Sequence, residues 1–295
     1  MARASGPHQI MTAVLFAATA LLWGGGALAT ALQAGVMPAP WSVALRMALA
    51  GVLLLLYGRI RHVPLGIPRR DRLYVALQGA LFFALAFISF YEAARRIPSG
   101  LAALVLSTSS LFAALIGRVL LGSALAPAML WGALCGIVGI GIIFGPGIGA
   151  LGSESGAGFA WALVSAIATG GGTVAGARNQ QAGLPTVAVL GWGALIGAAV
   201  SACWALAERQ PFVPDLSARY LGSLLYLAIA ASCVTFMLYF ELVRRLGPGR
   251  AAYTLATVPL VALILSALFE NLHLDGRIAV GAAAILLGNV LVLRR

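Results

Sequence analysis

The chain contains ten long apolar segments, each close to the length that a bilayer requires. A transmembrane helix needs about 17–25 predominantly apolar residues, whereas a membrane barrel needs strands of about ten residues with alternating polarity. These segments are continuous, so the sequence predicts an all-α membrane protein with ten transmembrane helices. The expected spans lie near 10–32, 39–57, 73–92, 98–120, 126–145, 157–177, 185–207, 220–240, 248–269 and 277–293.

Composition excludes the main alternatives to a membrane protein. Charged residues make up 9% of the 295 residues and hydrophobic residues 61%, whereas soluble domains carry about 25% charged residues. A soluble enzyme could not cover its surface with so few charges, and the chain is too apolar to be disordered. All 19 basic residues are arginine and lie in short groups between apolar segments. This pattern indicates the lipid bilayer as a partner, and no nucleic acid.

Arginine counts predict the orientation. If the amino terminus is cytoplasmic, 13 arginines fall in inner segments, 5 in outer segments, and Arg46 lies inside the second span. Basic loops stay in the cytoplasm, so both termini are expected there. A rival interpretation treats Ala27-Leu28-Ala29 as the cleavage site of a signal peptide, which would leave nine spans. The alanine- and arginine-rich composition indicates a bacterial chain and hence the cell inner membrane.

The two halves of the chain resemble each other at a shift of 149 residues. Residues 92–139 align with 241–288 without a gap and share 14 of 48 identities, where chance would give roughly 5. The repeat places five spans in each half, at 10–145 and 157–293. Five is an odd number, so the second half is expected to enter the membrane upside down. Inverted repeats of this kind are typical of secondary transporters, which move solutes by alternating access.

Several short motifs add a family resemblance. They are Leu22-Trp23-Gly24, Leu45-Arg46-Met47, Arg96-Ile97-Pro98-Ser99-Gly100, Arg250-Ala251-Ala252 and Val258-Pro259-Leu260. With the ten spans and the repeat, the chain resembles the drug/metabolite transporter superfamily, in its ten-helix branch with two EamA-type repeats. The resemblance implies export of small metabolites, often amino acids, through a cavity between the halves. Two departures are Gly122-Ser123, where members often have Gly-Glu, and Ser110, where they often have proline.

Polar and aromatic side chains within the spans are the candidates for substrate contact. Ser107, Thr108 and Ser110 follow one another in span 4, and Thr257 occupies the position of Thr108 in the second repeat. Such hydroxyls bind a substrate or bond carbonyls of their own helix. Aromatic walls suit apolar groups and ammonium cations, although single rings also face lipid. The candidate cavity residues are Trp23, Gln78, Phe82, Ser107, Thr108, Ser110, Trp161, Tyr239, Tyr253 and Thr257.

Other residues are candidates for moving parts. Pro259 lies near the middle of span 9, where it removes one helix hydrogen bond and frees the carbonyl of Leu255, so we expect a hinge. Glu92 and Glu241 precede arginine pairs at span ends, and they are either gate latches or local ion pairs. Arg46 is an intramembrane charge, which is either functional or reaches the outer interface.

What the spans lack also narrows the function. None of the eight acidic residues and three histidines lies in the middle of a span, so no proton relay is expected. No metal, cofactor or catalytic cluster is apparent, and the chain is not expected to be an enzyme. The function expected is export of small metabolites, with amino acids as substrates. Alternatives are drug or cation efflux, solute uptake and a non-transport membrane enzyme. The oligomeric state stays open, with a monomer as the simplest case.

The topology can be tested with single cysteines at Arg59 and Arg294. Both positions are expected on the cytoplasmic side, so a membrane-impermeant thiol reagent should label neither in intact cells and both after lysis. Labelling of either site from outside intact cells would contradict the orientation.

Overall fold

The structure is a bundle of helices. It is a computed structural model that describes residues 7–35, 37–121, 127–144, 152–246, 251 and 253–293, and no strand occurs among them. The longer helices are α1 (Pro7–Ala31), α2 (Ala39–Ile60), α6 (Ser109–Leu121), α7 (Pro127–Phe144), α8 (Gly152–Gln181), α9 (Thr186–Ala207), α11 (Thr235–Leu246), α13 (Tyr253–Phe269) and α14 (Gly276–Leu293). The shorter ones are η1 (Arg69–Asp71), α3 (Arg72–Gln78), η2 (Gly79–Leu85), α4 (Ala86–Ala94), α5 (Ser99–Leu106), α10 (Ala218–Leu225) and η4 (Tyr226–Val234).

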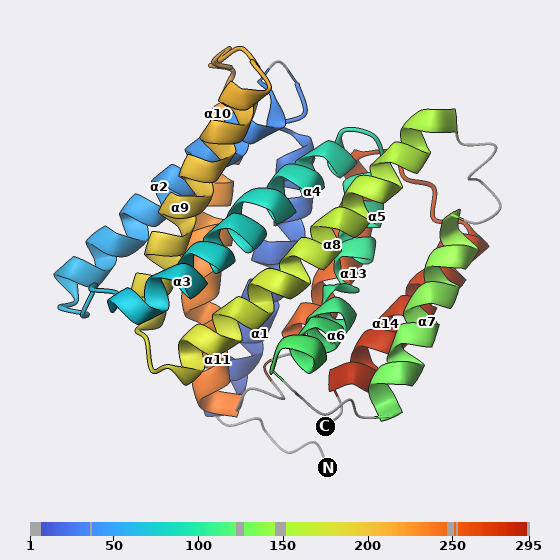
Figure 1. Ribbon diagram of the computed structural model, residues 1–295. Coiled ribbons are helices and arrows are strands. Elements are labelled where there is room, and N and C mark those ends of the chain that lie inside the picture. Colours follow the sequence, from blue (N-terminus) through green and yellow to red (C-terminus); the bar gives the residue numbers. More distant parts are fainter. Residues whose placement is uncertain are drawn as a thin grey trace.

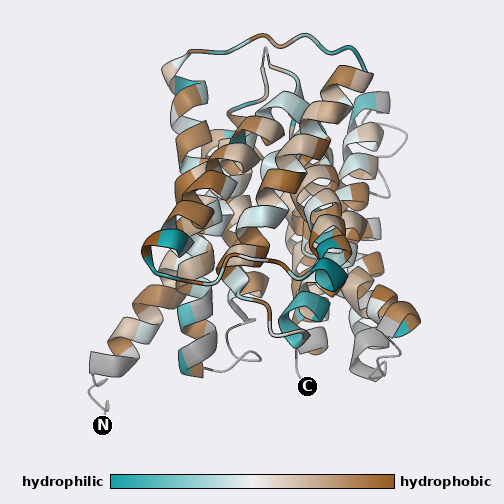
Figure 2. Cartoon of the chain, turned by 60° about the vertical axis from the view of Figure 1, so that its left-hand side comes forward, coloured by the Kyte–Doolittle hydropathy of each residue, from teal (hydrophilic) through white to brown (hydrophobic). Residues whose placement is uncertain are grey.

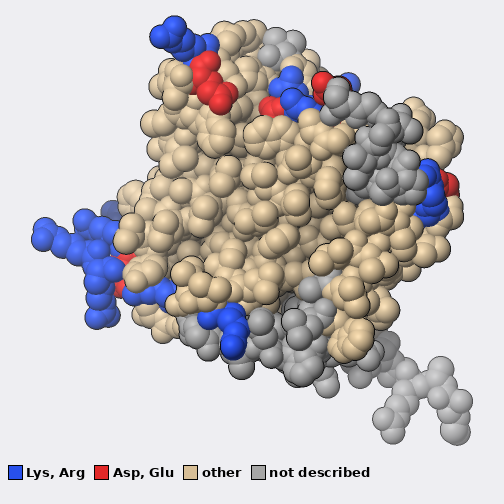
Figure 3. Space-filling model, turned by 45° about the vertical axis from the view of Figure 1, so that its right-hand side comes forward, with Lys and Arg blue, Asp and Glu red and all other residues tan. Residues whose placement is uncertain are grey.

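The helices have the length and polarity of membrane spans. Within the described residues, seven helical stretches are long and apolar enough to cross a membrane, and three more are apolar but shorter. Figure 2 shows hydrophobic residues along the helices and hydrophilic residues mainly where the chain turns. On the face in Figure 3, charged side chains gather toward the edges, and uncharged surface fills the area between them. The fold is therefore that of a multi-pass membrane protein.

Local sequence signals explain where several helices begin. Pro38, Pro98 and Pro185 immediately precede α2, α5 and α9. Proline lacks an N–H and has a fixed φ, so it fits best at the start of a helix. Before α14, Asp275 accepts a hydrogen bond from the backbone N–H of Ile278 at 2.8 Å. This bond, with nearby Arg277, holds the pKa of the Asp275 carboxyl below its usual value.

The helices form a regular set of neighbours (Figure 1). The α2 helix packs along α9, and α7 packs along α14 at the opposite side of the bundle. Between these pairs, α1 contacts α13 and α11, while α8 contacts α4 and α6. The α1 helix begins and α14 ends at the same side of the bundle. These contacts mostly join helices that are far apart in the sequence.

Span 4 differs from the expected continuous helix of 98–120. It breaks into α5 and α6 at Ser107 and Thr108. The hydroxyl of Ser107 donates to the carbonyl of Leu104, and that of Thr108 donates to the carbonyl of Val105, both at 2.7 Å. Serine and threonine hydroxyls compete with backbone N–H groups for helix carbonyls, and this competition explains the break.

Two π-helical segments occupy related positions in the two halves. They are η2 in the third expected span and η4 in the eighth. The shift of 149 residues places Gly79–Leu85 on residues 228–234, which lie within η4. The hydroxyls of Ser232 in η4 and of Thr235, the first residue of α11, donate to the carbonyls five residues earlier, at 2.8 and 2.6 Å. Segments of this type are frequent at functional sites.

Glycines bring α7 and α14 into close contact. A Cβ built on Gly139 would lie 2.5 Å from the carbonyl oxygen of Gly281, and one on Gly288 would lie 2.6 Å from that of Gly132. Because Gly132 and Gly139 are the repeat partners of Gly281 and Gly288, the two contacts are equivalent. As the residue number rises in one helix, its partner's number falls, so the helices run antiparallel. Small residues at such a crossing let two backbones approach.

The glycine crossing yields a stability prediction. Gly139→Ala should lower the melting temperature, because the new methyl group meets the α14 backbone and overpacking costs about 1–3 kcal/mol. Gly141→Ala is the matched control, since a Cβ there meets nothing within 4 Å. Thermal unfolding of both variants in detergent measures the difference. Equal melting temperatures for the two variants would show that this crossing does not hold the helices together.

Candidate functional site

An aromatic cluster connects α1 with α11. The ring of Trp23 lies 5.4 Å from that of Phe236 and 5.3 Å from that of Tyr239, between centroids. The indole Nε1 of Trp23 donates to the carbonyl oxygen of Ala231 in η4 at 3.1 Å. Two of the candidate cavity residues, Trp23 and Tyr239, are thus brought together although they are far apart in sequence.

Arg46 contacts the same segment of η4 as this cluster. Its side chain is only 5% exposed, and its Nη2 lies 3.4 Å from the Oγ of Ser232, the residue that follows Ala231. The guanidinium carbon lies 4.2 Å from the centre of the Phe87 ring. Arg46 therefore faces the interior instead of reaching the interface. Phe82, another candidate, packs against Phe87 with 6.1 Å between ring centres.

Glycines in α1 allow the close approach of η4. A Cβ on Gly25 would meet the Tyr226 hydroxyl at 2.5 Å, and this hydroxyl donates to the Leu22 carbonyl at 2.9 Å. A Cβ on Gly24 would lie 2.5 Å from Val261 of α13. Helix packing is therefore the observed role of these glycines. This packing fixes the position of α1, which carries Trp23 of the aromatic cluster.

The hydroxyl group of span 4 lies in a different contact. Asn289 of α14 donates from its Nδ2 to the Oγ of Ser107 at 2.9 Å, and its Oδ1 lies 3.4 Å from the Oγ of Ser110. Thr108 is buried and bonds within its own helix. Two candidates, Ser107 and Ser110, thus join the helix break to α14.

Gln78 takes part in a polar contact between α3 and α8. Asn179 donates to its Oε1 at 2.9 Å, and both side chains are buried. One residue away, Arg178 pairs with Asp71 at the start of α3 and stacks 3.7 Å above the ring of Tyr74. Gln78 therefore joins the two helices and lies apart from the aromatic cluster.

The remaining candidates are dispersed. Trp161 packs against the hydrophobic core around α5. The hydroxyl of Thr257 donates to the Thr254 carbonyl at 2.7 Å, and Pro259 is buried inside α13. The side chain of Tyr253 is outside the described residues, so its place in a cavity is still a prediction.

Glu92 and Glu241 both form ion pairs within their own helices. Glu92 contacts Arg96 and Arg95, and the Oε1 of Glu241 lies 2.6 Å from the Nε of Arg245. Arg96 also reaches Glu154 at the start of α8, with 3.5 Å between Nε and Oε2. Each glutamate therefore forms a local ion pair, and Arg96 also links the end of α4 to α8. The role of the two glutamates as gates stays a prediction.

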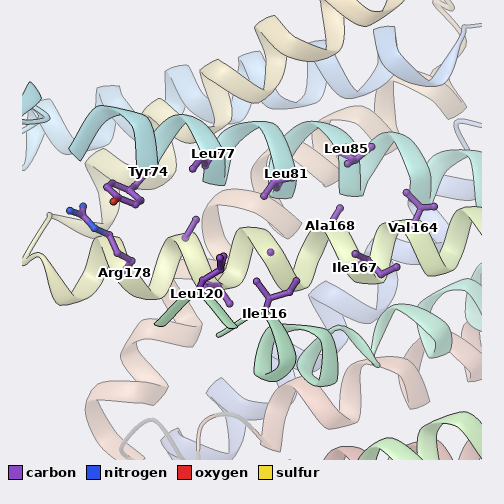
Figure 4. Close-up of a pocket in the computed structure, with 13 residues that line it drawn as sticks. Tyr74, Leu77, Leu81, Leu85, Ile116, Leu120, Val164, Ile167, Ala168 and Arg178 are labelled. Atoms are coloured by element: carbon purple, nitrogen blue, oxygen red, sulfur yellow. The ribbon is translucent and has the colours of Figure 1, made fainter. Parts of the chain in front are cut away.

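A groove of about 710 Å³ lies between α3, η2, α6 and α8 (Figure 4). Its walls are almost entirely aliphatic, and Tyr74 and Arg178 lie at one end. None of the ten candidate cavity residues lines it. Within the described residues, no group of three or more His, Cys, Asp or Glu side chains could hold a metal ion.

Sequence reasoning did not identify the partners that complete these contacts. Phe87 and Ser232 contact Arg46, and Gln33 accepts a hydrogen bond from Tyr91, which neighbours Arg46. Asn179 and Asn289 bond to candidate residues. Asn289 is a single amide within an apolar segment, which is the signal that could have identified it, whereas Asn179 lies among Arg178, Gln180 and Gln181 at the end of α8.

These features define a helical, multi-pass membrane protein built from two related halves. The EamA-like transporter family matches the chain twice, at residues 10–145 and 156–294. The chain therefore belongs to the EamA-like transporter family, and the resemblance seen in the sequence motifs is confirmed.

Individual proteins show the same relationship. Protein PecM of Dickeya dadantii (strain 3937) is 28% identical over 223 residues, which cover 75% of this chain and 73% of PecM. A crystal structure of a protein with 24% sequence identity covers 96% of this chain and 97% of its own, with a TM-score of 0.66. At this low identity, the similarity to the crystal structure shows a shared fold and nothing about function.

Proposed function

We propose that this protein is a secondary transporter that exports small metabolites by alternating access, with amino acids as the substrate class. It would consist of ten transmembrane helices in two inverted five-helix repeats, at 10–145 and 157–293. The observation that carries this proposal is the paired glycine contact of α7 and α14, in which repeat partners exchange places along antiparallel helices. Family membership supports transport of small solutes.

The packing of the other helices supports the same symmetry. Gly24 of α1 packs on α13, and Gly170 of α8 packs on Phe112 of α6. Under the shift of 149 residues, spans 1 and 9 correspond to spans 6 and 4, so these two contacts are related. Two halves with equivalent contacts can exchange conformations at similar energy. Such an exchange opens a central site to one side of the membrane and then to the other.

The aromatic cluster supports amino acids over other metabolites. Rings such as Trp23, Phe236 and Tyr239 attract both apolar groups and ammonium cations. Efflux of purely cationic drugs is the alternative, and the neighbouring Arg46 argues against it because like charges repel in a medium of low dielectric constant. Export from a bacterial cell would require the inner membrane, with both termini cytoplasmic. No catalytic step is part of the proposal.

Counterflow in proteoliposomes tests the function and its energy coupling. We expect internal unlabelled amino acid to drive accumulation of the labelled amino acid, tested across a panel. An imposed pH gradient alone should not drive accumulation, because the acidic residues lie near the ends of the apolar spans or in the loops between them, and none is placed to carry a proton across.

Empty liposomes control for leakage, and Glu92→Gln and Glu241→Gln should exchange substrate as the unaltered protein does. Accumulation driven by a pH gradient, and lost in either glutamine variant, would contradict the coupling. Absence of counterflow for every small metabolite tested would contradict the function.

A second prediction concerns Pro259. Pro259→Ala should restore the hydrogen bond to the Leu255 carbonyl and stiffen α13, so transport should slow several-fold while folding is retained. Initial rates of counterflow at saturating substrate measure the effect. Pro40→Ala is the control, since Pro40 lies in the first turn of α2, where no helix hydrogen bond is missing. An unchanged rate in Pro259→Ala would remove the hinge from the mechanism.

A further inference from the structure

Arg46 is a buried cation without an anionic partner. No acidic side chain pairs with it among the described residues, and all eight acidic residues of the chain belong to that set. Its recorded neighbours are the Ser232 hydroxyl, the Phe87 ring and the Tyr91 phenol. These groups are neutral, so the positive charge of Arg46 is not compensated by the protein.

A buried positive charge without an anionic partner lowers the stability of the protein. Charges within a membrane-spanning helix are expensive, and they are usually paired or lie on a substrate path. Leaving one member of a buried ion pair without its partner is strongly destabilising even in soluble proteins. A leucine or methionine would pack at this position without that cost. The charge therefore indicates a site that an anion occupies during the working cycle.

Two unused donors adjoin the same point. Neither the Nε of Arg46 nor the Nε2 of Gln33 has a hydrogen-bond partner among the described residues, and both atoms are buried. The Tyr91 hydroxyl donates to the Oε1 of Gln33 at 2.7 Å and also neighbours Arg46. The Tyr91 hydroxyl therefore neighbours both side chains that carry the unused donors. The planar guanidinium and the amide offer the N–H groups that carboxylate oxygens accept.

The aromatic cluster contacts the same segment of η4. Trp23 bonds the carbonyl of Ala231, and Arg46 contacts the next residue, Ser232. A small solute with an acidic end and an apolar or ammonium-bearing end matches this combination of a cation and aromatic rings.

We propose that Arg46, assisted by Gln33, binds the carboxylate of the transported solute. This inference rests on the proposed function and names the carboxylate as the group of the solute that the site recognises. It concerns binding only and involves no covalent step. Ser232 and Tyr91 are positioning residues, because they hold Arg46 and Gln33 through their hydroxyl groups.

Matched pairs of ligands test the inference on the purified full-length protein. The probes are L-phenylalanine with L-phenylalaninamide, L-leucine with L-leucinamide, and sodium benzoate with benzamide, with sodium nitrate as an inorganic anion. We expect each acid to raise the melting temperature with a half-maximal concentration at least about tenfold below that of its amide. Nitrate should have no effect at the same concentration.

Three substitutions connect this preference to the site. Arg46→Gln should remove the tenfold difference between acid and amide, and Arg46→Lys should keep part of it as a point charge. Arg59→Gln removes an equal charge from an exposed helix end and should change nothing. If Arg46→Gln does not fold, Gln33→Leu takes its place, with an expected weakening of acid binding of about threefold or more and no change for the amides.

The outcomes separate this inference from the proposed function. No stabilisation by any acid, equal stabilisation by amides or nitrate, or an unaltered preference in Arg46→Gln would each overturn the carboxylate site. Acid binding without counterflow would overturn the transport function and leave the site. Counterflow of both acids and amides with equal half-saturation would keep the function and remove the role of Arg46.

Discussion

The absence of water in the hydrocarbon core governs this structure, because every polar group there must find its partner within the protein. Helices satisfy the hydrogen bonds of the backbone, and hydroxyl side chains satisfy theirs by bonding to helix carbonyls. Ser107, Thr108, Ser232 and Thr235 all donate to carbonyls of their own helix segments. The acidic residues lie near the ends of the apolar spans or in loops, where arginines and backbone N–H groups meet them. Among the described residues, several buried side chains depart from this rule, and Arg46 is the one of them that carries a charge.

Sequence predicted the features that depend on composition over long stretches. The apolar segments overlap the helices, since hydropathy and helix length are fixed by the bilayer. The shift of 149 residues reappears in the paired glycines and in the two π-helical segments. The break at Ser107 was not predicted, because four hydroxyls in a row are compatible with a helix, and only their bonds to carbonyls decide whether it continues.

The candidate site was predictable only in part for a related reason. Trp23 and Tyr239 were identified as aromatic residues within spans, but their contact depends on the packing of α1 against α11. Gln78 and Ser107 were identified as polar, and their partners Asn179 and Asn289 come from other helices. A single sequence shows which side chains are unusual for a membrane. It does not show which of them satisfy one another, and this decides between a structural and a functional role.

The distribution of charge also bears on how such a protein could work. A carrier that binds an anion at a buried arginine gains from loading, because the bound carboxylate compensates a charge that is costly in the closed interior. The loaded form would then cross its closed state more readily than the unloaded form. Exchange of one solute for another would be favoured over net flux, and no titratable acid is required for it. The same physical cost that makes Arg46 unusual in a membrane helix would thus link substrate binding to the movement of the two halves.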